Sequence, residues 1–343
     1  MYDYSMNILE QIKNLTLNQK IKQLFIAGFE GENPDNCEIF QKLLKEGLGG
    51  VIFFTQNIKS KNQFKQIIDS IKEKALVPPF LSIDQEGGRV ERTEQIHNGK
   101  KYLSARFAAE KGIDFLESQT IEMLNELKNY GINMNFAPVL DVNTNDANPI
   151  IGERAYATST DDVIKYSQVI IDKHNELKII PVGKHFPGHG ASSVDSHVCM
   201  PIIDISKEEL ENIHVKPFKE SIKKGLDAIM VAHVHYPCFD KEIIPASLSK
   251  NVVQKYLIEE LNFQGLIISD DMIMGAVQGY SPIEACISAL NAGVNMFIFR
   301  HSDEKVLNLI ERIEDAVKAQ KLSEATIDNC LKRILNLKNS IIK

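Results

Sequence analysis

The chain has 343 residues, of which 43% are hydrophobic and 25% are charged, and its formal net charge is −7. This composition is ordinary for a soluble globular protein and excludes a largely disordered chain. Lysine and glutamate are interleaved along the sequence without a basic run, so the charge pattern argues against nucleic acid and anionic lipid as partners. We expect the partner to be a small molecule.

The N-terminal segment and the cysteines bear on the compartment. Residues 1–25 carry charges throughout and lack the apolar core of a secretory signal, and no apolar stretch approaches the ~18 residues that a membrane helix needs. The 5 cysteines are odd in number and show no CxxC spacing, which argues against a disulfide framework or a structural zinc site. We therefore predict a cytoplasmic protein without membrane contact, and both a monomer and a homodimer fit the sequence.

Short apolar runs alternate with helix-period segments along the whole chain, as in repeated βα units around a parallel sheet. The runs, in chain order, are 23–29, 49–54, 79–84, 134–142, 179–186, 227–237, 265–272 and 295–300. The segments between them, such as 62–76 and 281–293, place apolar residues at helical spacing. No GxGxxG fingerprint of an open doubly wound sheet follows any run. Eight runs and no linker predict a single (β/α)8 barrel domain over residues 1–343.

Several of these runs are apolar until their last positions and then end in ionisable residues. The residues concerned are Asp84, Asp141, Lys184 with His185, His233 with His235, and Asp270 with Asp271. In a (β/α)8 barrel the carboxyl ends of the strands form the rim on which active sites are built. The pattern therefore predicts one polar site at that rim.

The segment IDQEGGRVER, residues 83–92, follows the third apolar run. Asp84 lies at the rim, and the Gly87-Gly88 pair allows a sharp turn that could bring Arg89 or Arg92 back to the Asp84 carboxylate. A carboxylate accepts hydrogen bonds from two adjacent sugar hydroxyls, and an arginine can hold a third. The structural alternative is an Asp–Arg ion pair that only closes the βα turn.

The segment GKHFPGHGASSVDSHVCMP, residues 183–201, is a loop rich in Gly, Ser and His after the fifth run. Asp195 stands two residues before His197, and in an extended loop its carboxylate can fix the tautomer of the imidazole and favour the protonated form. A general acid requires this form. His185 and His189 could instead pin the loop without reacting.

The segment LIISDDMIMGA, residues 266–276, brings two adjacent acids to the end of the seventh run. Neighbouring residues on a strand point to opposite faces, so we expect only one of Asp270 and Asp271 to face the barrel mouth. The other is expected to be a cap or turn residue, because aspartate is common at such positions.

A metal site is the competing interpretation, because His185, His189, His197 and the HVH at 233–235 could supply ligands. In a zinc amidohydrolase that HxH motif would stand on the first strand, whereas here it stands on the sixth, and the Lys184 cation would repel a metal ion. We therefore predict no metal and no cofactor. The isolated histidines His97, His174, His214 and His301 are expected to be structural.

Taken together, IDQEGGRVER, NFAPVLDVN, GKHFPGHGASSVDSH and ISDDMIMGA resemble family 3 glycoside hydrolases of the β-N-acetylglucosaminidase type over about residues 20–300. The resemblance implies a (β/α)8 barrel, hydrolysis of terminal β-linked N-acetylglucosamine with retention, and a role in recycling cell-wall muropeptides. It implies that Asp270 is the nucleophile and that Asp195 and His197 are the acid/base dyad.

The same resemblance assigns sugar contacts to Asp84, Arg92, Arg154, Lys184 and His185. Arg154 departs from the family pattern, because it stands in GERAYAT where an R-S-F/Y context is usual. Three alternatives stay open. A phosphorylase fits because a histidine acid/base is neutral after donating its proton and does not repel phosphate; a broader β-glycosidase or a sugar-binding barrel would use the same residues.

Overall fold

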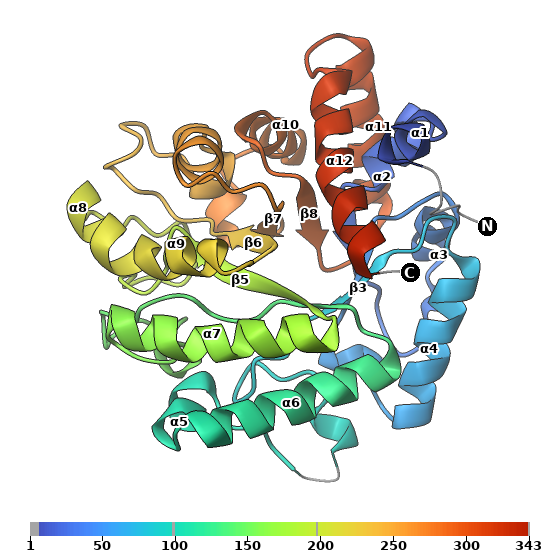
Figure 1. The fold of residues 1–343 in the computed structure, drawn as a ribbon. Helices are drawn as coiled ribbons and strands as arrows, with labels where there is room; N and C mark the ends of the chain where they lie inside the picture. Colours follow the sequence, from blue (N-terminus) through green and yellow to red (C-terminus); the bar gives the residue numbers. More distant parts are fainter. Residues whose placement is uncertain (1–6, 98–99, 197, 342–343) are drawn as a thin grey trace.

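The computed structural model of the chain describes residues 7–97, 100–196 and 198–341, and eight parallel strands form a closed barrel in it (Figure 1). The strands are β1 (Phe25–Ala27), β2 (Gly50–Phe53), β3 (Phe80–Ile83), β4 (Met134–Asn135), β5 (Ile180–Phe186), β6 (Ala228–Val231), β7 (Leu266–Asp271) and β8 (Met296–Phe299). Each lies inside one of the predicted runs, and β8 pairs with β1 to close the barrel. The predicted (β/α)8 fold class is confirmed, whereas the division into a single domain stays a prediction.

Helices surround the barrel (Figure 1). The α-helices are α1 (Ile8–Lys13), α2 (Leu17–Lys22), α3 (Glu38–Lys45), α4 (Lys61–Lys74), α5 (Ala105–Glu110), α6 (Ile113–Tyr130), α7 (Thr160–Leu177), α8 (Lys207–Glu209), α9 (Lys216–Lys223), α10 (Pro282–Ala292), α11 (Glu304–Lys318) and α12 (Glu324–Ile341). Two π-helical stretches, η5 (Leu210–Val215) and η7 (Asn251–Glu260), complete the ring. The first and last helices, α1 and α12, pack side by side.

The local sequence explains the bounds of these helices. Helix α4 buries Phe64, Ile67, Ile68 and Ile71, an i, i+3, i+4, i+7 pattern that turns one face to the barrel. Helix α10 begins after Ser281, whose side chain accepts a hydrogen bond from the Glu284 backbone in a capping box, and ends at a glycine in the left-handed conformation.

Helix α12 packs against the amino-terminal side of the barrel. Lys338 on this helix is fully buried, donates to the Oε1 atom of Gln23 at 2.8 Å and lies 5.1 Å above the ring of Phe80. Gln23 lies two residues before β1, and Phe80 is the first residue of β3. The carboxyl ends of the strands are thus left for the polar site.

Two strands break their register near those carboxyl ends. The pairing of β5 with β6 shifts between Gly183 and Phe186, and the pairing of β7 with β8 shifts between Ile268 and Asp271. An extra residue on one strand disturbs the alternation of side chains between the two faces. The ionisable pairs Lys184–His185 and Asp270–Asp271 both fall within these irregular stretches.

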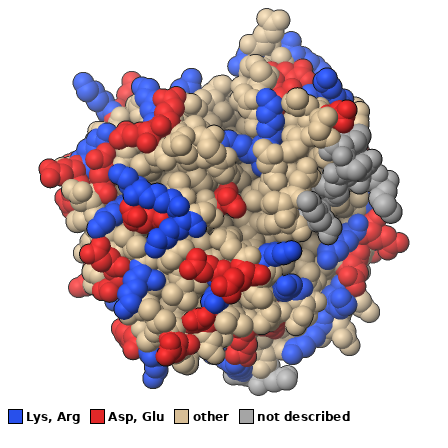
Figure 2. Space-filling model, viewed as in Figure 1, with Lys and Arg blue, Asp and Glu red and all other residues tan. Residues whose placement is uncertain are grey.

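The surface shown in Figure 2 carries acidic and basic side chains in a mixed arrangement, and neither sign gathers into a continuous patch on that face. Over the described ranges, no helix combines the length and the apolar character that crossing a bilayer would require. All five cysteines are unpaired thiols.

Candidate active site

A cavity of about 410 Å3 opens among the carboxyl ends of the strands. Six of the predicted site residues line it together: Asp84, Arg92, Arg154, Lys184, His185 and Asp270. Asp195 is half-buried on the loop after β5 and does not itself line the cavity, but its neighbour Ser196 does. The predicted acid/base residue His197 lies outside the described residues.

The turn after β3 brings Arg92 back to Asp84, as predicted. Gly87 and Gly88 both adopt positive φ angles of 92° and 62°, which other residues rarely adopt. The Nη2 atom of Arg92 then lies 3.6 Å from Oδ2 of Asp84. Arg89 turns away instead and donates to the backbone carbonyls of Pro149 and Ile150.

Lys184 links two carboxylates across the barrel. Its Nζ atom lies 2.8 Å from Asp84 Oδ1 and 2.6 Å from Glu86 Oε1, although the lysine side chain is only 2% exposed. Burial opposes the ionisation of Asp84, but the charges of Lys184 and Arg92 outweigh it and hold the pKa of this carboxyl below its usual value. Asp84 and Lys184 are therefore a charged pair ready to bind polar groups of a ligand.

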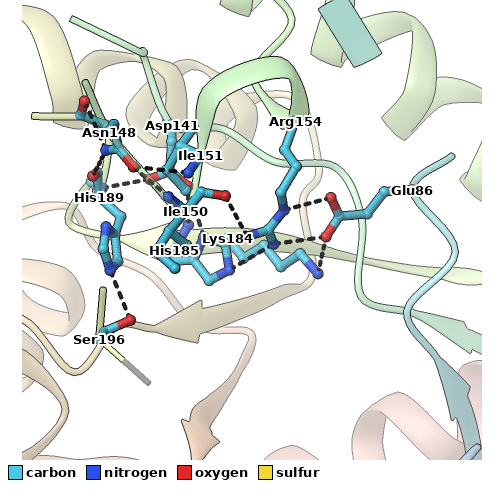
Figure 3. Close-up of polar contacts among 12 residues, drawn as sticks. Glu86, Asp141, Asn148, Ile150, Ile151, Arg154, Lys184, His185, His189 and Ser196 are labelled. Carbon is cyan, nitrogen blue, oxygen red and sulfur yellow. Dashed lines mark hydrogen bonds and ion pairs between the residues drawn. The ribbon is translucent and has the colours of Figure 1, made fainter. Parts of the chain in front are cut away.

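Glu86 is a site residue that the sequence did not predict. It is buried between Lys184 and Arg154, and the Arg154 guanidinium binds it through two nitrogens at 2.9 Å each (Figure 3). Arg154 also reaches Nε2 of His185 at 3.3 Å. The unusual sequence context of Arg154 does not remove its side chain from the cavity.

Asp141 holds the two histidines of the loop after β5. Its carboxylate lies 2.7 Å from Nδ1 of His185 and accepts a hydrogen bond from the backbone N–H of His189 at 2.6 Å. Burial opposes the charge on Asp141, but His185 and His189 outweigh it, so the pKa of Asp141 lies below its usual value. This carboxylate fixes the His185 ring, whose other nitrogen faces Arg154.

His189 pins the loop from inside, which was one of the two roles considered for it. Burial lowers the pKa of His189 to about 4, so its ring is neutral at neutral pH. Its Nε2 atom lies 3.0 Å from the hydroxyl of Ser196 (Figure 3). The next residue, Gly190, packs so tightly against the Val142 carbonyl that a Cβ atom would collide with it.

Both acids at the end of β7 line the cavity, so the expectation that only one of them faces the barrel mouth is wrong. The register shift between Ile268 and Asp271 breaks the alternation on which that expectation depends. Asp271 is nevertheless a turn residue, because its Oδ1 atom accepts a hydrogen bond from Ile273 N at 3.2 Å. Its Oδ2 atom lies 3.5 Å from Arg300 Nε.

The end of β8 adds two residues that sequence reasoning did not assign to the site, Arg300 and His301. The Arg300 guanidinium lies 5.3 Å above the ring of Phe54, and Arg92 lies 5.7 Å above the same ring. This edge of the cavity therefore combines an aromatic face with two cations.

Two of the histidines considered as metal ligands, His233 and His235, have polar partners within the protein. Nδ1 of His233 lies 2.6 Å from the hydroxyl of Ser247, and Nδ1 of His235 lies 3.1 Å from the Ile244 carbonyl oxygen. In the part of the chain that the structure describes, no group of three or more His, Cys, Asp or Glu residues is arranged to hold a metal ion.

Comparison with known proteins gives the class to which this fold and site belong. The family model described as "Glycosyl hydrolase family 3 N terminal domain" matches residues 16–337. The chain therefore belongs to glycosyl hydrolase family 3 and is a glycoside hydrolase.

Individual relatives within this family carry the name beta-hexosaminidase. The Beta-hexosaminidase of Haemophilus influenzae is 33% identical over 272 residues, which cover 78% of this chain and 76% of the relative. Beta-hexosaminidase A of Pseudoalteromonas piscicida is 29% identical over 330 residues, and the chain spans only 55% of its length.

A solved structure shows the same fold. The glycoside hydrolase family 3 beta-N-acetylglucosaminidase from Paenibacillus sp. str. FPU-7 superposes with a TM-score of 0.90 at 33% identity, over 96% of this chain. The chain spans 64% of that longer protein.

Proposed function

We propose that this protein is a retaining exo-β-N-acetylglucosaminidase that hydrolyses terminal β-linked N-acetylglucosamine through a covalent glycosyl–Asp270 intermediate. The observation that carries the proposal is the cavity that Asp270 lines together with Asp84 and Lys184, the latter paired with the buried carboxylate of Glu86. The choice of N-acetylglucosamine as the sugar rests on the names of the relatives. The reaction needs no metal or cofactor.

The charged network is suited to holding one sugar ring. Arg92, Arg154 and Lys184 present donors to the cavity, and Asp84 presents an acceptor for hydroxyl groups. Each cation is already balanced by a carboxylate, so the side chains stay ordered before the sugar binds. Such preorganisation lowers the barrier by holding the anomeric carbon in place.

The chemistry has two steps. In the first, Asp270 attacks the anomeric carbon and the C–O bond to the leaving group breaks, while the His197 imidazolium gives its proton to the departing oxygen. In the second, the neutral imidazole takes a proton from water, which attacks the anomeric carbon and releases Asp270. Asp195 orients the His197 ring. The position of Ser196 at the cavity supports these roles, because Asp195 and His197 flank it in the sequence.

The size of the cavity supports action at chain ends. About 410 Å3 is at the lower end of the range for small-molecule sites and suits a single sugar residue with part of its leaving group. Muropeptide fragments of the bacterial cell wall are the proposed substrates, with the cytoplasm as the proposed location. The five free thiols support a reducing compartment.

A panel of 4-nitrophenyl β-glycosides, assayed with and without phosphate, tests the reaction. We expect the N-acetylglucosaminide to be turned over fastest, with free N-acetylglucosamine as product at every phosphate concentration. Formation of the sugar 1-phosphate, with a rate that rises with phosphate, would instead show a phosphorylase. Preincubation with EDTA should leave the rate unchanged, whereas a loss that zinc restores would favour the metal-dependent alternative. A second assay measures release of N-acetylglucosamine from purified disaccharide-peptide fragments.

A further inference from the structure

Ser196 is a buried residue that lies between the two members of the proposed acid/base dyad in the sequence. It stands between Asp195 and His197, it is only 2% exposed, and it lines the cavity. Two nearby residues of this loop are more open, with Val194 at 38% and Val198 at 75% exposed. The loop therefore enters the protein interior at Ser196.

On one side Ser196 is bound to the sugar-binding network. Its hydroxyl lies 3.0 Å from Nε2 of His189, whose backbone N–H is held by Asp141 at 2.6 Å. The His189 carbonyl oxygen accepts a further hydrogen bond from Nδ2 of Asn148 at 2.9 Å. Asp141 also contacts Nδ1 of His185, and Nε2 of His185 contacts Arg154 (Figure 3).

On the other side Ser196 is bound to the segment that carries the nucleophile. Its carbonyl oxygen accepts a hydrogen bond from Ala276 N at 3.2 Å. Ala276 follows the end of β7, and the turn between them is closed by a hydrogen bond from Met274 N to the Asp271 carbonyl oxygen at 3.0 Å. The side chain and the backbone of Ser196 thus contact two different walls of the cavity.

We propose that Ser196 and His189 are positioning residues that hold the acid/base loop against the strand of the nucleophile. The two contacts of Ser196 fix the residue that stands between Asp195 and His197 in the sequence. This inference rests on the function proposed above. It adds that efficient proton donation depends in part on the hydrogen bond between the uncharged side chains of Ser196 and His189.

The physical consequence is selective. A general acid accelerates only the departure of a leaving group that needs a proton, and displacement by about 1 Å can cost a factor of about 100. Loosening the loop should therefore slow the hydrolysis of poor leaving groups, while an activated phenolate departs unaided. Sugar binding should stay intact because the ion pairs of Arg154 and Lys184 do not involve Ser196.

The test compares Ser196→Ala with Ser192→Ala. Ser192 is a matched control, because it is a buried serine of the same loop whose hydroxyl bonds only to the Val194 backbone among the described residues. In Ser196→Ala we expect kcat/KM for a β-linked N-acetylglucosamine disaccharide to fall by roughly 10- to 100-fold, and that for the 2,4-dinitrophenyl glycoside by less than about 3-fold. Inhibition by free N-acetylglucosamine should not change, and Ser192→Ala should keep the wild-type ratio.

A second pair of variants tests whether the effect passes through His189. His189→Leu should reproduce the leaving-group selectivity of Ser196→Ala, and the double variant should be no worse than either single variant, because both remove the same hydrogen bond. His189→Gln keeps a polar group near Nε2 and should recover part of the loss. Multiplying losses in the double variant would overturn the proposal.

These experiments distinguish a failure of the positioning role of Ser196 from a failure of the proposed mechanism. Selectivity for good leaving groups in His197→Ala, together with wild-type ratios in a folded Ser196→Ala, would overturn the positioning role and leave the mechanism standing. Equal losses on both substrates in both variants would overturn the mechanism as well. Thermal unfolding of each variant establishes that the losses do not come from misfolding.

Discussion

Glu86 and Arg154 form a two-pronged ion pair inside the barrel mouth, with Nε–Oε2 and Nη2–Oε1 distances of 2.9 Å each. Their side chains are only 4% and 10% exposed. Burial opposes the charge of Glu86, but Arg154 and Lys184 outweigh it and hold the pKa of this carboxyl far below its usual range. Glu86 therefore stays ionised and organises two of the residues proposed to bind the sugar.

Replacement Glu86→Gln should destabilise the protein by about 3 kcal/mol, because it leaves the buried Arg154 charge without a carboxylate. KM should rise because Arg154 and Lys184 lose their common partner. Urea unfolding and steady-state kinetics measure the two effects, with the exposed carboxylate of Glu94, in Glu94→Gln, as the control. Unchanged stability and KM would contradict the organising role.

The effect of Glu86 should also depend on pH. Because its folded-state pKa is depressed, its stabilisation is complete above the unfolded-state pKa of about 4.5 and is lost as the pH falls towards the folded-state value. The difference in unfolding temperature between the wild type and Glu86→Gln should therefore shrink on going from neutral to strongly acidic solution. A constant difference over this range would show that Glu86 acts through its shape alone.

Asp270 and Asp271 should differ sharply when each is replaced by asparagine. Asp270→Asn removes the proposed nucleophile and should lower turnover by about 10⁴ or more. Asp271→Asn can keep the hydrogen bond to Ile273 N and weakens the pairing with Arg300 without removing the proposed nucleophile, so it should be much milder. A 2- or 5-fluoro glycoside followed by peptide mass spectrometry should label Asp270; a label on Asp271 would reverse the assignment.

His197→Ala should harm poor leaving groups far more than good ones in the first step and should slow the second step for every substrate. The glycosyl-enzyme would then accumulate, and azide should restore turnover by attacking it directly. Asp195→Asn should give a weaker version, because the imidazole remains but is held less firmly. Without azide rescue in His197→Ala, the proton donor would have to be sought elsewhere, with His185 and Asp84 next in line.

Lys338 should make stability depend on pH near neutrality. Burial lowers the pKa of Lys338 to about 7, against 10.5 for an ordinary lysine. Between these values the unfolded chain binds more protons, so stability should rise with pH, whereas the penalty is fully present below pH 7. Lys338→Met should remove this rise in unfolding temperatures measured from pH 6 to about 10, and Lys332→Met, an exposed lysine of the same helix, should keep it. Equal slopes in the wild type and Lys338→Met would show that Lys338 stays protonated.

The barrel and much of its rim could be predicted because they depend on strong local patterns. Each strand is a short apolar run, and residues such as Asp84 and Lys184 interrupt these runs where a core residue would be expected. The return of Arg92 to Asp84 follows from two glycines that only a tight turn explains. The apolar runs, the ionisable residues at their ends and the glycine pair are all local patterns that span only a few residues of the sequence.

The missing parts of the site depend on contacts between distant segments. Glu86 stands beside Gly87 in a turn, and only the approach of Arg154 and Lys184 from two other segments of the chain reveals its role. His301 was expected to be structural, yet it lines the cavity because β8 ends beside β1 and β7. The strand register that places both Asp270 and Asp271 at the mouth leaves no mark in the residue types.

The two register shifts allow a single strand to place two adjacent ionisable residues in the cavity. On a regular barrel strand, side chains alternate between the inside of the barrel and the apolar layer under the helices. Of two adjacent residues at a strand end, only one can therefore point into the barrel, and the other must be compatible with the apolar layer. Straightening β7 by deleting one residue would force a carboxylate into that layer, at a penalty of several kcal/mol. Strands β5 and β7 instead each contribute two neighbouring ionisable groups to the same small volume. When new activities are engineered on this scaffold, keeping the lengths of β5 and β7 should therefore matter more than keeping any particular side chain on them.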